Sequence, residues 1–334
     1  MKDFAAAVQL LNANQVDKGI EKLKALIAAF PTDAATEKAK GLLLDYGVGE
    51  EARVVLDDRK VFRGSFKMLD KDVLAMVEAA LEELKPYYSG VQPFFKKREL
   101  RVIFYDSEPR YRKAGGMVTA AGHFSMEKPD YRARTLEGKI EWYLPKHAAT
   151  LKDRQLSMKG LLLHETAHYR NAVAFGGALP GVFEEGIATY LQSRHNTEYY
   201  QYYRTTDREE IQGNARNALS SVIKLEDFVA FLQGDRGFGQ GGEMIHRWYG
   251  LCYAITDFFQ EGQLNGKKSS FDVLLGKVES LTAEVVAKMK PGDRPQRLNS
   301  KDMLEKIVAD VYEQKLEDFH KALIQHVMTK YRQR

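Results

Sequence analysis

The chain has 334 residues, of which 44% are hydrophobic and 29% are charged. This composition is typical of a folded globular protein and excludes a disordered chain. Fifty Lys and Arg residues against 46 Asp and Glu residues leave a formal charge of +4, which gives no support for nucleic-acid binding.

The cysteine content and the hydropathy pattern bear on disulfide formation, membrane insertion and cellular compartment. Cys252 is the only cysteine and cannot form an intramolecular disulfide. No apolar run approaches the roughly 20 residues of a membrane span. The start of the chain, MKDFAAAVQLLNANQ, lacks a signal-peptide pattern. The chain as given is therefore expected to be cytoplasmic, whereas a removed export signal would make it periplasmic or secreted.

Residues 1–57 are predicted to be helical, because apolar residues recur at spacings of three and four, with Pro31 and Gly47 as stops. Two helices followed by FPTD resemble one tetratricopeptide-type pair. A single pair cannot bury its apolar face. We therefore expect a helical extension packed on the main domain, with a separate partner-binding array as the alternative.

Residues 58–158 are predicted to form an α/β sub-domain with a small mixed sheet. The segment KDVLAMVEAALEELKPYY has a helical period and can be capped by Asp70 or Asp72. Runs of strand-type residues bounded by Pro, Gly or Asp surround it. Strands are expected at residues 61–69, 99–106, 119–127 and 139–145.

Residues 159–334 are predicted to form a mostly helical sub-domain, because helical periods recur between turn signals. Helices are expected at residues 155–175, 182–194, 208–219, 225–233, 243–260 and 314–331, with two more before the last. The glycine-rich segment 233–242 is expected to be a mobile loop and a candidate lid.

The segment LLLHETAHYR contains the pattern His-Glu-x-x-His. On a helix, His164 and His168 lie one above the other and can present both imidazoles to one metal ion. Glu165 is rotated about 100° from His164. It would therefore lie beside the ion, where it could take a proton from water. The spacing predicts two zinc ligands and a general base.

This pattern arises by chance in about one chain in a hundred of this length, so a third ligand is needed. The segment LPGVFEEGIATYLQ supplies Glu185 in the first two turns of the next helix. Gly186 follows it and would let this helix press against the histidine helix. Glu184 is the rival ligand, but it points about 100° away from Glu185, so only one of the two can face the metal.

These segments resemble the gluzincin metallopeptidases, and more closely the peptidase-MA-like domains. In that family His-Glu-x-x-His is followed by Pro-x-aromatic-x-x-Glu-Gly-x-Ala. Pro180, Glu185, Gly186 and Ala188 are in register, whereas Val182 replaces the aromatic residue. The resemblance implies an α+β, zincin-like fold and one catalytic Zn²⁺ held by His164, His168 and Glu185.

The resemblance extends to HRWYGLCYAITDFFQ, where Tyr249 matches the tyrosine of a later family helix. In gluzincins such a residue donates a hydrogen bond to the oxyanion, a contact worth about 3 kcal/mol in the transition state. Tyr249 could equally be a core aromatic residue, and His246 is a nearby alternative donor.

In zincins an edge strand beside the histidine helix holds the substrate backbone. AAGHFSME is the candidate strand here, and its His123 could line the cleft, although a lone strand histidine is more often at the surface. Asn171 and Glu184 are candidates to support the ligating imidazoles. The remaining histidines with no partner at metal-ligand spacing are expected at the surface. They are His147, His195, His320 and His326.

Two functions follow from these observations. The first is a zinc metallopeptidase, in which Glu165 is the general base, Tyr249 stabilises the oxyanion, and the substrate is a peptide or protein. The second is a non-catalytic zincin-like scaffold that recruits a protein partner through residues 1–57. Glu165 favours the enzyme, because a scaffold has no use for a base beside the metal.

Overall fold

The protein is described here by a computed structural model. The structure describes residues 2–13, 15–31, 35–36, 38–39, 43, 52–56, 60–64, 70–105, 108–117, 120–143, 151–201, 203–219, 221–234, 243–290 and 292–331.

A five-stranded mixed sheet is built in the first half of the chain, in the order β1-β2-β3-β5-β4. The inner strands β2, β3 and β5 are parallel, and β1 and β4 pair antiparallel at the two edges. β4 therefore has one unpaired edge among the described strands. The strands are β1 (Ala52–Leu56), β2 (Lys60–Gly64), β3 (Lys97–Tyr105), β4 (Gly122–Asp130) and β5 (Thr135–Tyr143).

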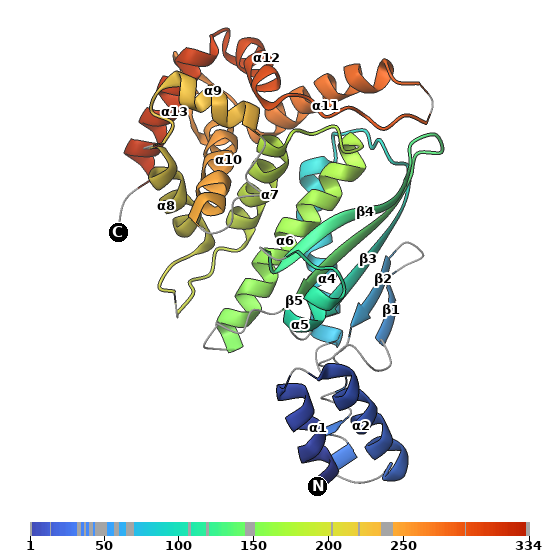
Figure 1. Cartoon of the computed structure of the whole chain (residues 1–334). Coiled ribbons are helices and arrows are strands. Elements are labelled where there is room, and N and C mark those ends of the chain that lie inside the picture. The colour runs from blue at the N-terminus through green and yellow to red at the C-terminus, as the bar shows by residue number, and fades with distance from the viewer. Residues whose placement is uncertain are drawn as a thin grey trace.

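Three helical segments accompany the sheet in the first half. Helix α4 (Asp70–Leu84) continues into the 3-10 turn η2 (Lys85–Tyr88), where Pro86 occupies an early position that needs no N–H. The short helix α5 (Glu108–Lys113) follows β3. Helix α4 packs against α6, which lies between the sheet and the later helices (Figure 1).

The two helices that carry the candidate site are α6 (Leu151–Phe175) and α7 (Gly181–His195). α6 contacts β4 and β5 on one side and α7 on the other. A helix covered on two sides needs apolar residues around most of its circumference. This explains the run of buried side chains from Leu162 to Tyr169, and why polar residues within it need specific partners.

Six further described helices and a hairpin of two short strands follow α7, and α8, α10 and α12 contact it. The largest of their contacts join α10 to α7 and to α8. The elements are α8 (Asp207–Leu219), α9 (Leu225–Gly234), α10 (Glu243–Glu261), β6 (Gln263–Leu264), β7 (Lys267–Lys268), α11 (Phe271–Ala287), α12 (Ser300–Tyr312) and α13 (Leu316–Lys330).

The N-terminal helices α1 (Lys2–Asn12) and α2 (Val16–Ala29) form a hydrophobic cluster of their own. Ala35, Ala39 and Leu43 complete this cluster, so the pair buries its apolar face against the segment that follows it. The larger core cluster contains none of these residues. Figure 1 shows the pair apart from the sheet.

The expected α+β class with a mixed sheet and a helical second half is confirmed. The structure refines two expected boundaries. β1 lies inside the range 1–57 and belongs to the sheet, so the helical part of that range ends before Ala52. The expected boundary at residue 158 falls within α6, which begins at Leu151. Within the described residues, no helix has the length and apolar character needed to cross a membrane.

Candidate metal centre

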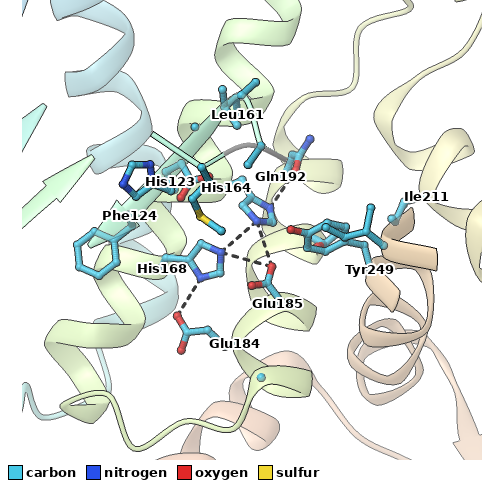
Figure 2. A pocket seen from close by; sticks show the side chains of 18 of the residues that line it. His123, Phe124, Leu161, His164, His168, Glu184, Glu185, Gln192, Ile211 and Tyr249 are labelled. Atoms are coloured by element: carbon cyan, nitrogen blue, oxygen red, sulfur yellow. Dashed lines mark hydrogen bonds and ion pairs between the residues drawn. The ribbon is translucent and has the colours of Figure 1, made fainter. Parts of the chain in front are cut away.

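His164, Glu165 and His168 lie in the middle of α6, and Glu185 lies in the second turn of α7. All four side chains are buried. The helical spacing brings the two imidazoles together, with Nε2 of His164 3.0 Å from Nε2 of His168. Oε2 of Glu185 lies 3.3 Å from Nε2 of His164 and 3.5 Å from Nε2 of His168 (Figure 2). Three possible ligand atoms from two helices therefore converge on one point.

The other nitrogen of each imidazole faces an oxygen of α7. Nδ1 of His168 lies 2.9 Å from Oε1 of Glu184, and Nδ1 of His164 lies 3.1 Å from Oε1 of Gln192. These oxygens accept hydrogen bonds, so a neutral imidazole carries its proton on Nδ1 and has a lone pair on Nε2. The two Nε2 atoms therefore present lone pairs to each other and to the Glu185 carboxylate.

The lone pairs explain why the arrangement fits a divalent cation. Oε2 of Glu185 is buried and forms no hydrogen bond to a described residue, which would be costly if nothing else balanced it. In a tetrahedral zinc site the ligand atoms stand about 3.3 Å apart, since each lies about 2.0 to 2.1 Å from the ion. The three separations of 3.0, 3.3 and 3.5 Å lie close to that value.

The electrostatics favour a positive charge among these groups. Burial would raise the pKa of Glu185, but the positive charge that His168 and His164 carry when protonated holds it at about 2. Burial would lower the pKa of His168, but the charge of Glu185 and the hydrogen bond to Glu184 leave it well above the usual value. A buried anion and two imidazoles therefore stabilise a cation between them.

Glu184, the rival ligand, does not face this point. Its carboxylate instead accepts the Nδ1 proton of His168, as a residue that orients a ligand would. Asn171, the other candidate for this support, bonds to neither histidine. Its Oδ1 accepts a hydrogen bond from the phenol of Tyr88, and its Nδ2 donates to the backbone oxygen of Glu184.

Two supporting residues were missed by the sequence analysis. Gln192 lies seven residues after Glu185 on the same face of α7, and its Nε2 donates to Oδ2 of Asp207 at 3.0 Å. The same oxygen accepts a hydrogen bond from Asn196 at 2.9 Å. The seven-residue spacing after Glu185 was the available signal for Gln192, whereas Asp207 comes from another helix.

Glu165 follows His164 on α6, is buried, and lines the cleft with the candidate ligands. Its carboxylate forms no hydrogen bond or ion pair with a described residue. Burial raises the pKa of Glu165, and the charges of His164 and His168 oppose that shift. The carboxylate is thus free to accept a hydrogen bond from a water molecule or a ligand.

Tyr249 reaches the centre from α10, and its ring centroid lies 5.8 Å from that of His164 in an edge-to-face arrangement. Burial, followed by the charges of Glu185 and Glu165, raises the pKa of Tyr249. The phenol therefore keeps its proton and can donate a hydrogen bond. His246 lies one turn earlier, is exposed, and lines the same cleft.

Gly186 sets the distance between α7 and α10. A Cβ atom at this position would lie 2.5 Å from the backbone oxygen of Cys252 and 2.5 Å from Oγ1 of Thr256. Only glycine allows these helices to approach so closely. The approach holds Tyr249 of α10 near Glu185 of α7. The expectation that Gly186 lets its helix press against the histidine helix was wrong, because the nearest atoms to a Cβ there belong to α10 and not to α6.

A cleft of about 560 Å³ opens over the centre. β4 forms one wall, and α8 and α10 form the opposite wall. Figure 2 shows His123 and Phe124 on one side of the two imidazoles and Tyr249 and Ile211 on the other. Gly122 to Phe124 of the edge strand line the cleft, and no other described strand pairs with that side of β4, where an extended ligand could add.

The sequence analysis left two positions open for His123, in the cleft or at the surface. His123 lines the cleft. Its Nδ1 lies 2.8 Å from the phenol oxygen of Tyr111. Its Nε2 lies 3.4 Å from Oε2 of the buried Glu141. These partners hold the imidazole in one orientation.

The expectation that three other histidines lie free at the surface was wrong. His320 is buried, stacks on Phe228, and donates from Nε2 to the backbone oxygen of Val222 at 2.7 Å. His195 lies 2.8 Å from Glu83, and His326 lies 3.0 Å from Asp257. Their partners lie 69 to 112 residues away in the chain, which local spacing cannot reveal. His147 and most of the glycine-rich segment 233–242 lie outside the described residues.

Comparison of the chain with models of known protein families gives no match, and comparison with curated proteins gives none either.

Proposed function

We propose that this protein is a zinc-dependent metallopeptidase with a zincin-like fold, of the gluzincin type. The observation that carries the proposal is the convergence of Nε2 of His164, Nε2 of His168 and Oε2 of Glu185 within 3.5 Å of one another. Two imidazoles and one carboxylate are the protein ligands of catalytic zinc sites that keep a fourth position for water or substrate. The cleft over them gives a substrate access.

The chain's own residues would hold and orient the ion. His164, His168 and Glu185 are the ligands, while Gln192 and Glu184 fix the imidazoles by accepting their Nδ1 protons. A bound zinc ion supplies Lewis-acid chemistry, polarising the substrate carbonyl and lowering the pKa of water.

Glu165 and Tyr249 have the two remaining roles, which are proton transfer and stabilisation of the oxyanion. Glu165 accepts the proton of the attacking water and returns it to the leaving amine, and its burial in the cleft wall places it for this role. Tyr249 donates its phenol proton as a hydrogen bond to the oxyanion, from the side of the cleft opposite β4. The free edge of β4 pairs with the substrate backbone and aligns the peptide bond over the centre.

The test combines metal analysis with peptide cleavage. Purified protein is loaded with zinc, freed of excess metal, and measured for zinc content by mass spectrometry. Wild type and Glu165→Gln are then given a mixed peptide library, with Glu226→Gln as the control for an exposed carboxylate. We expect one zinc per chain in all three proteins. Cleavage by Glu165→Gln should fall about 10² to 10⁴-fold, as loss of a general base requires.

The outcomes separate the two functions that the sequence raised. Zinc binding with cleavage that depends on Glu165 supports the enzyme. Zinc binding without cleavage by wild type supports a non-catalytic scaffold and overturns the peptidase. Absence of zinc binding overturns both, because each depends on the same three ligands.

A further inference from the structure

The cleft is lined by charged residues other than the metal ligands, and the acidic and basic ones lie at different ends. Carboxylates of α8 lie at one end and an arginine lies at the other. The residues concerned are Asp207, Glu210 and Arg297, all of which line the cleft.

The acidic end is built on one face of α8. Asp207, Glu210, Ile211 and Asn214 all line the cleft, at the spacing that places side chains on one side of a helix. Asp207 is anchored to Gln192. Glu210 is exposed and forms no ion pair or hydrogen bond through its side chain with any residue in the described ranges. Its charge is therefore available to a ligand.

The basic end is defined by the segment before α12. The backbone N–H of Leu298 donates to the oxygen of Ala178 at 3.1 Å, which fixes this segment beside the start of α7. Arg297 precedes it, is exposed, and makes no ion pair or hydrogen bond among the described side chains. Its guanidinium is the one permanent cation among the described residues that line the cleft.

The length of helix α7 gives the approximate distance between the acidic and basic ends of the cleft. Gly181 marks the arginine end and Gln192, bonded to Asp207, marks the acidic end. Eleven residues of α-helix span about 16 Å. An extended peptide covers the same length with about five residues, at about 3.3 Å each. Glu185 lies between the ends, so the metal centre would face the interior of such a peptide.

The hydroxyl group of Thr189 is a further polar group that could bind a ligand between the two ends of the cleft. Thr189 lies one turn after Glu185 and lines the cleft, yet its buried Oγ1 has no hydrogen-bond partner within the described residues. A buried hydroxyl without a partner is costly unless a ligand or water pairs with it. Thr189 is thus placed to bond a ligand between the centre and α8.

We propose that the cleft selects peptides with opposite charges on the two sides of the scissile bond. A Lys or Arg side chain would lie near Glu210 and Asp207, and an Asp or Glu side chain near Arg297. His246, one turn before Tyr249, lines the cleft as well. This selectivity rests on the proposed peptidase function.

The test measures binding separately from cleavage. Zinc-loaded Glu165→Gln is titrated with fluorescent hexapeptides of one length, and the dissociation constant is read from anisotropy. Five peptides are compared. One has Lys before and Glu after the central bond, and a second has the reverse order. The other three carry Lys at both positions, Glu at both positions, and Ala at both positions. We expect one mixed order to bind about tenfold more tightly than the Ala peptide, and less so in high salt. Wild type should cleave the same order fastest.

Charge reversal supplies the decisive variants. Glu210→Lys and Arg297→Glu should each weaken the favoured peptide about tenfold, and the double variant should favour the reverse order. Glu226→Lys and Arg294→Glu change the same charges away from the cleft and should leave the preference unchanged.

The outcomes distinguish this inference from the proposed function. Equal binding of all five peptides, or a preference that survives both reversals, overturns the charge selectivity even if the peptides are cleaved. A preference that reverses in the double variant without any cleavage supports the selectivity and overturns the peptidase.

Discussion

Glu185 and Asp257 are both fully buried carboxylates with lowered pKa values, but their surroundings differ. The oxygens of Asp257 accept hydrogen bonds from the phenol of Tyr331 at 2.7 Å and from Nε2 of His326 at 3.0 Å. Lys330 adds a charge 3.7 Å away. Oε2 of Glu185 faces two imidazole nitrogens whose protons lie on their far sides.

The comparison separates a structural carboxylate from a candidate ligand. Donors on α13 and after it satisfy Asp257, so this residue ties the C-terminal helix to α10. Glu185 faces two imidazole nitrogens that act as acceptors when neutral, and a divalent cation would satisfy all three atoms at once. Burial and pKa direction are therefore not enough to identify a site, and the nature of the neighbouring atoms decides.

The largest expected effect is on the metal. Glu185→Ala should weaken zinc binding by about 10³-fold or more, because one of three ligands is lost. Asp257→Ala should leave the zinc affinity unchanged. Competition with a chelator of known affinity measures both. Equal zinc affinity of Glu185→Ala and wild type would end the distinction between the two carboxylates.

The second effect concerns stability, and here Asp257→Ala should have a larger effect than Glu185→Ala. Asp257→Ala leaves His326 and the phenol of Tyr331 without their buried partner and should lower the free energy of unfolding by about 3 to 5 kcal/mol. Urea denaturation of the metal-free protein measures this change. Glu185→Ala under the same conditions should cost much less, since its Oε2 has no hydrogen bond to lose. Equal losses would contradict the contrast.

The third effect tests the groups that orient the imidazoles. Glu184→Ala and Gln192→Ala should each weaken zinc binding about 10 to 100-fold, less than loss of a ligand. Glu184→Ala also decides between the neighbouring carboxylates. A loss as large as that of Glu185→Ala would make Glu184 a ligand.

A smaller effect is expected from packing. Gly186→Ala places a methyl group 2.5 Å from the Cys252 backbone oxygen and should cost about 1 to 3 kcal/mol of stability. It also moves Tyr249 away from Glu185, so cleavage should fall while zinc is still bound. Thermal unfolding and zinc content measure the two parts. Gly276→Ala is the control, because a Cβ there meets no atom within 4 Å.

The smallest effect is a pH dependence. Burial would raise the pKa of Asp257, but the hydrogen bond from His326 and the charge of Lys330 hold it below its usual value. The unfolded value is about 3.9. A lowered folded pKa contributes stability above that pH and loses it as the pH falls through the folded value. The stability difference between wild type and Asp257→Asn should therefore shrink from pH 6 to pH 3 in urea titrations. A constant difference would show that the charge of Asp257 contributes nothing.

The local pattern was sufficient for the helix that carries the histidines and for the neighbour that carries Glu185. Periodicity predicted helices over residues 155–175 and 182–194, and α6 and α7 cover them. The four-residue spacing places His164 and His168 on one face, and the 100° rotation between helical residues allows only one of Glu184 and Glu185 to face the metal. The choice of Glu185 came from the resemblance of its segment to Glu-Gly-x-Ala. Apart from that choice, these predictions need only the geometry of one helix at a time.

Contacts between distant segments were decided by the tertiary structure. Asp207 reaches the centre from α8 through Gln192, and His320 is buried against α9, although neither position has a local signal. β1 joins the sheet by pairing with β2. The helical range therefore ends before Ala52 and not at residue 57, as the sequence pattern had predicted. Sequence spacing determines which side chains share a face of a helix. Which faces meet depends on many weak packing contacts across the whole chain, and these exist only once it has folded.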